Sequence, residues 1–123
     1  MPKRILIVDD NAAIRRLLRA FLGSQFGFEV CGEADDGVDG IAKARELFPD
    51  LVVLDLSMPR MNGLEAAAAL RQIVPNVPLI LFTLHRDSIS SSTARGLGIA
   101  SVVSKTEKIE VLFKEVQRLL SAA

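Results

Sequence analysis

The chain has 123 residues, of which half are hydrophobic, and its 15 basic residues balance its 15 acidic ones. This length fits one compact domain, and the even charge balance excludes a global basic field that would attract nucleic acid or anionic membranes. The single cysteine, Cys31, excludes an internal disulfide framework and favours a reducing compartment. The first apolar run spans only residues 5–8, which is too short for a signal peptide or a membrane span, so we expect a cytoplasmic protein.

The first half of the chain predicts three strands with two helices between them. In chain order these are a strand at 5–8, a helix at about 12–22, a strand at 28–34, a helix that follows Asp36-Gly37 and ends before Pro49, and a strand at 51–54. Apolar residues of the first helix recur at the spacing of an amphipathic helix, with Asn11 as the expected N-cap. The second helix ends before Pro49 because the residue preceding a proline disfavours helical backbone.

The second half predicts a helix at about 64–74, a strand at 79–82, a helix at 88–97, a short strand that includes 101–103, and a helix at 108–120. The helix at 88–97 is rich in serine, and serine hydroxyls compete with the backbone for hydrogen bonds. Two interpretations of this segment stay open: a weak surface helix, or an element of low stability that shifts when a neighbouring site changes.

Five strands that alternate with five helices predict an α/β fold with right-handed crossovers. The sheet is then parallel and covered by helices on both faces, as a three-layer sandwich. No linker, repeat or low-complexity segment divides the chain, so residues 1–123 are expected to form one domain.

Polar residues with chemical potential follow the expected strands. They are Asp9, Asp10, Asp55, Thr83 and Lys105. In parallel α/β sheets the ligands bind outside the carboxyl ends of the strands, so these five side chains are expected to converge on one site.

Three carboxylates at one site repel one another, by about 4 kcal/mol per pair at 4 Å and an effective dielectric of 20. Such a cluster persists if a cation neutralises it or if one acid stays protonated. Because the candidate ligands are all oxygens, Mg²⁺ is favoured over zinc or copper, and Mg²⁺ commonly shares phosphate oxygens. Asp55 is then a candidate nucleophile that forms an aspartyl phosphate, with Lys105 and Thr83 suited to phosphate oxygens.

Together with Met58-Pro59 and Gly63, this ordered set resembles the receiver domain of two-component response regulators, over residues 3–121. The resemblance implies a flavodoxin-like (βα)5 fold with strand order 2-1-3-4-5. It implies that Asp55 is the phosphoacceptor, receiving phosphate from a sensor histidine kinase or a phosphotransfer protein. Such a domain promotes its own phosphorylation and dephosphorylation but turns over no independent substrate, so it is not expected to be an enzyme in the ordinary sense.

The family also implies a role for each residue of the site. By this resemblance, Asp10 would bind Mg²⁺ directly and Asp9 would bind it through a water molecule. Asp55 and the backbone carbonyl of Ser57 would complete the protein ligands of the metal. Thr83 would bind the phosphoryl group and signal its presence, and Lys105 would pair with it.

The partners that the resemblance implies are the kinase, which docks on part of the first helix, and an output domain or partner protein. The latter would bind the face formed by the fourth helix, the fifth strand and the fifth helix, and phosphorylation could drive homodimerisation. The stretches Cys31-Gly32-Glu33-Ala34 and 54–59 are most similar to receivers that carry a helix-turn-helix output. No basic recognition helix follows Ala123, so direct nucleic-acid binding by this chain is not expected.

The sequence departs from the family at two positions. Val102 stands where the family often has an aromatic residue that rotates on activation, so a rotating ring is not the switch here. Thr106 stands where the family often has a proline after a cis bond; a cis bond before a non-proline costs about 2.5–4 kcal/mol, so we expect a trans bond, with Thr106 as a candidate cap for the last helix. His85 and Ser57 occupy variable positions beside the site and are candidates for tuning dephosphorylation.

Three alternatives remain open. The chain could be a pseudo-receiver that binds partners without being phosphorylated, although the complete acidic set argues against this. A phosphatase with an aspartate nucleophile typically needs a second acid two residues later, where this chain has Ser57. A nucleotide- or flavin-binding domain would need a glycine-rich loop after the first strand, where this chain has Asp9-Asp10-Asn11.

Overall fold

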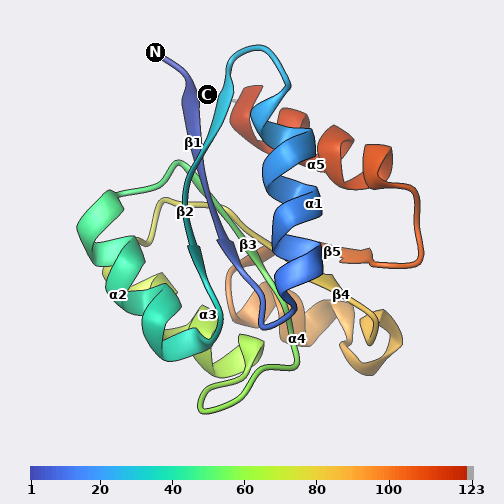
Figure 1. The fold of residues 1–123 in the computed structure, drawn as a ribbon. Helices are drawn as coiled ribbons and strands as arrows, with labels where there is room; N and C mark the ends of the chain where they lie inside the picture. Colours follow the sequence, from blue (N-terminus) through green and yellow to red (C-terminus); the bar gives the residue numbers. More distant parts are fainter. Residues whose placement is uncertain (122–123) are drawn as a thin grey trace.

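The computed structural model describes residues 1–121 as an α/β domain (Figure 1). Its strands are β1 (Lys3–Val8), β2 (Phe28–Ala34), β3 (Leu51–Leu54), β4 (Leu79–Thr83) and β5 (Ile99–Ser104). Its helices are α1 (Ala12–Gly23), α2 (Gly37–Leu47), α3 (Gly63–Ile73), α4 (Ser91–Gly96) and α5 (Ile109–Ser121), and a 3-10 turn, η1 (Arg86–Ser88), precedes α4.

The five strands form one parallel sheet in the order β2-β1-β3-β4-β5, which confirms the expected fold and strand order. The register pairs Val8 of β1 with Leu54 of β3, the last residue of each strand. The Asp55 N–H extends this ladder by donating to the Val8 carbonyl at 2.9 Å. Asp9 and Asp55 therefore leave the sheet side by side.

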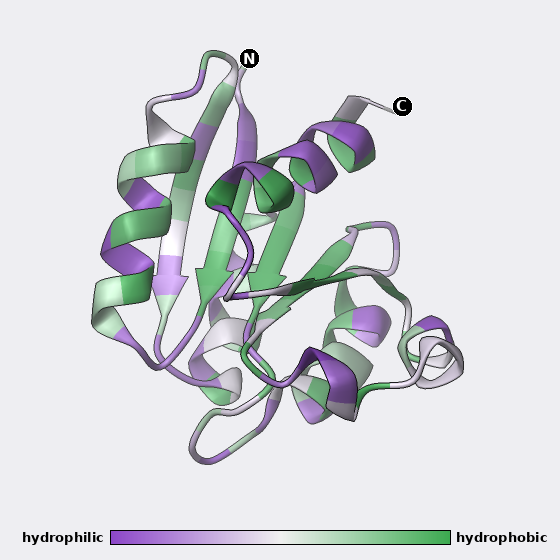
Figure 2. Cartoon of the chain, turned by 90° about the vertical axis from the view of Figure 1, so that its right-hand side faces the viewer, coloured by the Kyte–Doolittle hydropathy of each residue, from purple (hydrophilic) through white to green (hydrophobic). Residues whose placement is uncertain are grey.

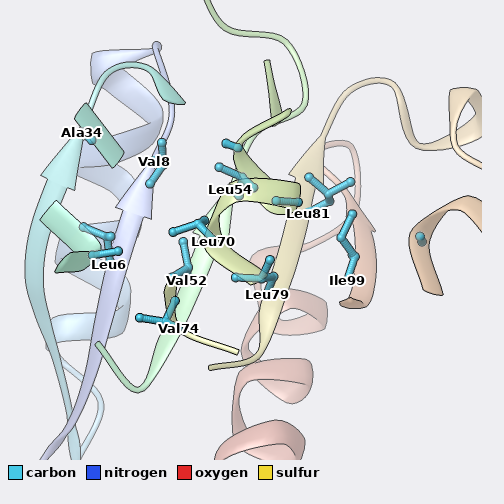
Figure 3. Close-up of a cluster of buried hydrophobic side chains, with 14 residues drawn as sticks. Leu6, Val8, Ala34, Val52, Leu54, Leu70, Val74, Leu79, Leu81 and Ile99 are labelled. Atoms are coloured by element: carbon cyan, nitrogen blue, oxygen red, sulfur yellow. The ribbon is translucent and has the colours of Figure 1, made fainter. Parts of the chain in front are cut away.

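Each face of the sheet has its own hydrophobic core. On one face, α1 and α5 contribute Leu18, Leu22, Leu112 and Val116 to a core with residues of the strands. On the other face, α2, α3 and α4 pack over Leu6, Val8, Val52 and Leu54 and their neighbours, as Figure 3 shows for part of this core. Figure 1 shows α1 and α5 on one side of the sheet, with α2 and α3 on the other.

β3 is apolar along its whole length, and β4 is apolar up to Thr83, its last residue; Figure 2 shows mostly green strands in the middle of the sheet. All four residues of β3 and all five of β4 are buried. Alternation of polar and apolar residues is absent from these strands because helices cover both faces. The short apolar runs of the sequence therefore predicted β3 at its observed bounds.

Two predictions in the second half were wrong in detail. The helix expected at 88–97 begins only at Ser91, because Ser88 ends η1 and the Ile89 backbone is extended. The Ser90 hydroxyl caps α4 by accepting from the Thr93 N–H at 3.1 Å. Thr106 does not cap the last helix, which begins at Ile109; its hydroxyl instead hydrogen-bonds the Ser104 hydroxyl at 2.7 Å.

Other local predictions are confirmed. Asn11 caps α1, with its side-chain oxygen accepting from the N–H groups of Ala13 and Ile14 at 2.9 and 3.1 Å. All peptide bonds of the described residues are trans, including the bond that precedes Thr106. In residues 1–121, every helix is too short or too polar to cross a bilayer.

Candidate functional site

An acidic cluster lies at the carboxyl ends of β1 and β3. Asp9, Asp10 and Asp55 each place a carboxylate oxygen within 4.8 Å of the others. Asp9 and Asp55 are 2% and 6% exposed, whereas Asp10 is exposed to solvent. The cluster follows directly from the β1–β3 register, since parallel strands that end together bring the residues after them to the same edge.

Lys105 lies against this cluster from the loop that follows β5. Its Nζ is 2.7 Å from Asp9 Oδ2 and 3.2 Å from Asp55 Oδ2, and its side chain is only 9% exposed. The Lys105 N–H donates to the Thr83 carbonyl at 2.9 Å, which fixes the loop to the end of β4. Among the described residues, the Lys105 ammonium is therefore the single positive charge paired with both Asp9 and Asp55, and it neutralises the negative charge of the cluster only in part.

The pKa of Asp9 is raised above its ordinary value. Burial of the carboxylate is the main cause, and the Asp55 charge adds to it. The Lys105 ammonium and the Asn11 N–H, which donates to Asp9 Oδ1 at 2.9 Å, act in the opposite direction without overcoming the burial. The site thus holds a carboxylate that an added cation would stabilise in its charged form.

A cavity of about 220 Å³ opens to solvent beside the cluster. The residues that line it come from four loops and are Asp10, Asn11, Asp55, Ser57, Leu84, His85 and Lys105. The two variable positions, Ser57 and His85, therefore face the same space as the Asp55 carboxylate. A group bound to the Asp55 carboxylate would lie in this cavity.

Thr83 is placed differently from the other expected site residues. It is the last residue of β4, it is fully buried, and it is not among the residues that line the cavity. Its Oγ1 accepts a hydrogen bond from the His85 N–H at 3.0 Å. The hydroxyl keeps its own proton to donate, so a role toward a phosphoryl group stays a prediction.

The backbone contacts of residue 63, next to the site, require a glycine. Its N–H donates to the Leu56 carbonyl at 2.7 Å, and a Cβ at this position would lie 2.2 Å from the Asp55 carbonyl oxygen. The start of α3 can therefore approach the backbone of the acidic residue only if residue 63 has no side chain.

Sequence reasoning missed two residues of the site. Asn11 was assigned only a capping role, although it also lines the cavity. Arg15 donates from Nη1 to the Asp9 carbonyl at 2.7 Å and from Nε to Glu33 at 3.2 Å, so it ties α1 to β1 and β2. The position of Asn11 next to the acid pair could have indicated the first; the second depends on tertiary contact and left no local signal.

The donor set fits a hard divalent cation. Three carboxylates supply oxygen ligands within 4.8 Å of one another, and neither histidine nor cysteine belongs to the cluster. Mg²⁺ prefers such oxygen ligands, of which it commonly takes only one or two from carboxylates and the rest from carbonyls, water and phosphate. The arrangement can therefore bind a cation and place a phosphate oxygen beside it.

Comparison with known proteins identifies relatives of the chain. Residues 5–117 match the family model of the response regulator receiver domain. The response regulator protein VraR of Staphylococcus saprophyticus is 31% identical over 118 residues, covering 96% of this chain and 56% of VraR. The chemotaxis protein CheY of Thermotoga maritima is 43% identical over 81 residues, which are 66% of this chain and 67% of that protein.

The fold has a close counterpart among solved structures. A two-component response regulator of the LuxR family from Aurantimonas superimposes with a TM-score of 0.91 at 30% identity, covering 98% of this chain and 86% of that one. The chain thus spans little more than half of the length of VraR, while it matches most of the length of this solved chain.

Proposed function

Because the chain belongs to the response regulator receiver family, we propose that it is a phosphoacceptor switch in two-component signalling, with Asp55 as the phosphorylated residue. One observation carries this proposal: the buried Asp55 carboxylate opens on a cavity, next to Asp9 and Asp10 and 3.2 Å from the Lys105 ammonium. The phosphoryl donor would be the phosphohistidine of a sensor kinase or of a phosphotransfer protein.

The proposed transfer has a simple balance of bonds. An Asp55 carboxylate oxygen attacks phosphorus, an O–P bond forms, and the P–N bond to the donor imidazole breaks. The bonding electron pair stays on the imidazole nitrogen, which takes up a proton from water. The Lys105 ammonium is close enough to the attacking carboxylate to stabilise the negative charge that develops on the oxygens of the transferred phosphoryl group.

Asp9, Asp10, Asp55 and the Ser57 carbonyl would hold Mg²⁺ in this function. When bound, Mg²⁺ supplies positive charge that offsets the repulsion among carboxylates and phosphate oxygens. Asp10, the exposed member, is the ligand best placed for exchange with solvent, whereas Asp9 is buried and already hydrogen-bonded to Lys105.

We propose that the signal leaves the site through Thr83 and the segment that follows it. The Thr83 hydroxyl accepts a hydrogen bond from the His85 N–H, and His85 directly precedes η1, which leads to α4. If Thr83 turned to donate to a phosphoryl oxygen, this hydrogen bond would rearrange and the start of η1 would be free to shift. The α4–β5–α5 face is the proposed binding surface for an output domain or partner, or for a second copy of the chain.

The decisive experiment is incubation with Mg²⁺ and a small phosphodonor, followed by intact mass spectrometry. The proposal predicts the gain of one phosphoryl group by the wild-type chain and no gain by Asp55→Asn. Asp50→Asn, which removes a carboxylate at the amino end of the sheet, serves as the control and should be phosphorylated normally. Absence of any gain, together with no response to beryllofluoride, would favour the pseudo-receiver alternative.

Ser57 and His85 are proposed to set the lifetime of the phosphorylated state. Both line the cavity beside Asp55, so each controls the access of water to a phosphoryl group there. Exchanging both side chains for alanine should change the rate at which the phosphorylated chain loses its phosphate. An unchanged lifetime would remove this part of the proposal and leave the phosphoacceptor role of Asp55 intact.

A further inference from the structure

An ion pair joins the loop that follows β3 to the start of α2. Arg60 lies in the loop at residues 55–62, and its Nε donates to Asp36 Oδ2 at 2.7 Å while its Nη2 contacts the same oxygen. We call this contact the Arg60–Asp36 latch. It connects two elements that lie 24 positions apart in the sequence.

The Asp36 end of the latch is fixed. The side chain is 6% exposed, and its second oxygen, Oδ1, caps α2 by accepting from the Asp39 N–H at 2.8 Å. The hydrogen bond from Asp39 and the one from Arg60 hold the pKa of Asp36 below its ordinary value. The carboxylate is therefore a charged acceptor at the positive end of a helix, hydrogen-bonded through both of its oxygens.

The Arg60 end adopts an unusual backbone conformation. Arg60 has φ of +64°, in the left-handed region that residues with a Cβ rarely enter. Phe48, the other described non-glycine residue with positive φ, ends α2 as its C-cap, a position where such a conformation is common. Arg60 ends no helix; it is the central residue of a tight turn in which the Met61 N–H donates to the Pro59 carbonyl at 2.7 Å. Strained residues of this kind cluster at functional sites.

The next residue adds a second contact between the same two elements. The Met61 carbonyl and side chain lie so close to Gly37 that a Cβ on Gly37 would be 2.7 Å from the carbonyl oxygen. The loop is thus pressed onto the first turn of α2, and the latch closes over this contact.

The latched loop is also the loop that carries Ser57. At its end, the Gly63 N–H donates to the Leu56 carbonyl, but Ser57 itself is exposed. The Arg60–Asp36 latch, whose Arg60 side chain is 62% exposed, and the contact of Met61 with Gly37 together connect the second half of this loop to α2.

We propose that Arg60 and Asp36 are positioning residues that hold the loop in the shape in which the Ser57 carbonyl can join the acidic cluster at Mg²⁺. This inference rests on the proposed function, and neither residue touches the cation. Its consequence is that breaking the latch weakens Mg²⁺ binding without removing any ligand.

The test is calorimetric titration of Mg²⁺ into the metal-free chain at fixed ionic strength. Arg60→Ala is expected to raise the dissociation constant about ten-fold, the lower end of the range for residues that orient metal ligands. Arg118→Ala is the matched control, because Arg118 donates twice to Glu115 on the exposed surface of α5 and its side chain is exposed to a similar extent. Its dissociation constant should equal that of the wild type.

Phosphorylation kinetics provide a second readout. At limiting Mg²⁺, Arg60→Ala should be phosphorylated more slowly than the wild type, and saturating Mg²⁺ should restore the rate. Asp36→Asn should weaken Mg²⁺ binding in the wild type but not further in Arg60→Ala, because both substitutions break the same latch.

The outcomes separate the two proposals. A wild-type affinity in Arg60→Ala, or additive effects of the two substitutions, would overturn the latch while leaving the phosphoacceptor role intact. If the wild-type chain neither binds Mg²⁺ nor accepts phosphate, the proposed function fails and the latch loses its role with it.

Discussion

Lys105 lies closer to Asp9 than to Asp55: its Nζ is 2.7 Å from Asp9 Oδ2 and 3.2 Å from Asp55 Oδ2. The Lys105 ammonium therefore pairs mainly with Asp9, an expected Mg²⁺ ligand, while it stays within hydrogen-bonding distance of Asp55, the expected nucleophile. A divalent cation that binds Asp9 must therefore compete with the Lys105 ammonium for the Asp9 oxygens.

Replacing Lys105 with methionine should separate these two roles. Because the competing charge is lost, Mg²⁺ should bind several-fold more tightly in calorimetric titration. Phosphorylation of Asp55 should be slower at saturating Mg²⁺, since no ammonium follows the transferred charge. Lys108→Met, which removes an exposed lysine three residues later, should leave both quantities unchanged. Weaker Mg²⁺ binding in Lys105→Met would contradict the competition.

Stability in metal-free buffer should depend on pH through Asp9. Its folded-state pKa is raised, so between its unfolded value, near 3.8, and the higher folded value the folded chain holds more protons than the unfolded chain. The contribution of Asp9 to the free energy of unfolding therefore falls as the pH rises through this window. The Asp9→Asn variant has no carboxylate that must ionise in the folded state. Its free energy of unfolding should therefore rise relative to that of the wild type as the pH rises.

Urea denaturation at a series of pH values measures this difference. Asp87→Asn, which alters an exposed carboxylate of η1, is the control and should run parallel to the wild type. A difference between Asp9→Asn and the wild type that stays constant with pH would rule out the raised pKa.

Two glycine substitutions should have opposite effects on stability. Gly63→Ala would place a Cβ 2.2 Å from the Asp55 carbonyl oxygen, and because that obstacle is backbone, we expect a loss of about 1–3 kcal/mol or more. Gly96→Ala meets no atom within 4 Å and lies in α4, where alanine should stabilise by about 0.5–1 kcal/mol. Urea denaturation measures both, and equal effects would contradict the close approach at Gly63.

The neighbours Val102 and Val103 should differ in their tolerance of a large side chain. Val102 is half-buried and lines a cavity of about 420 Å³ with Ile89 and Ala94, so Val102→Phe should change the free energy of unfolding by less than about 1 kcal/mol. Val103 is 4% exposed in the core with α1 and α5, and Val103→Phe should cost about 1–3 kcal/mol. A large loss in both variants would mean that the cavity cannot accept a ring.

The sequence predicted what depends on local pattern. The apolar runs before Asp9 and Asp55 indicated buried strands, and parallel topology alone then brought their carboxyl ends together. Lys105 could be assigned to the same edge, but its preference for Asp9 depends on side-chain geometry that no local pattern encodes.

Two features could not be predicted for physical reasons. The late start of α4 accompanies an extended backbone at Ile89, which packs against the core, and helix propensity does not report such tertiary packing. The contact between Arg60 and Asp36 joins positions 24 residues apart, and it requires a backbone conformation at Arg60 that arginine alone would not indicate.

The length of β1 has a practical consequence for experiments on this domain. Met1, whose side chain is fully exposed, precedes β1, while Asp9 follows it. The six strand residues that lie between them span about 20 Å. A fluorophore attached at residue 1 would therefore lie at the opposite end of β1 from the acidic cluster, where it would not obstruct the site.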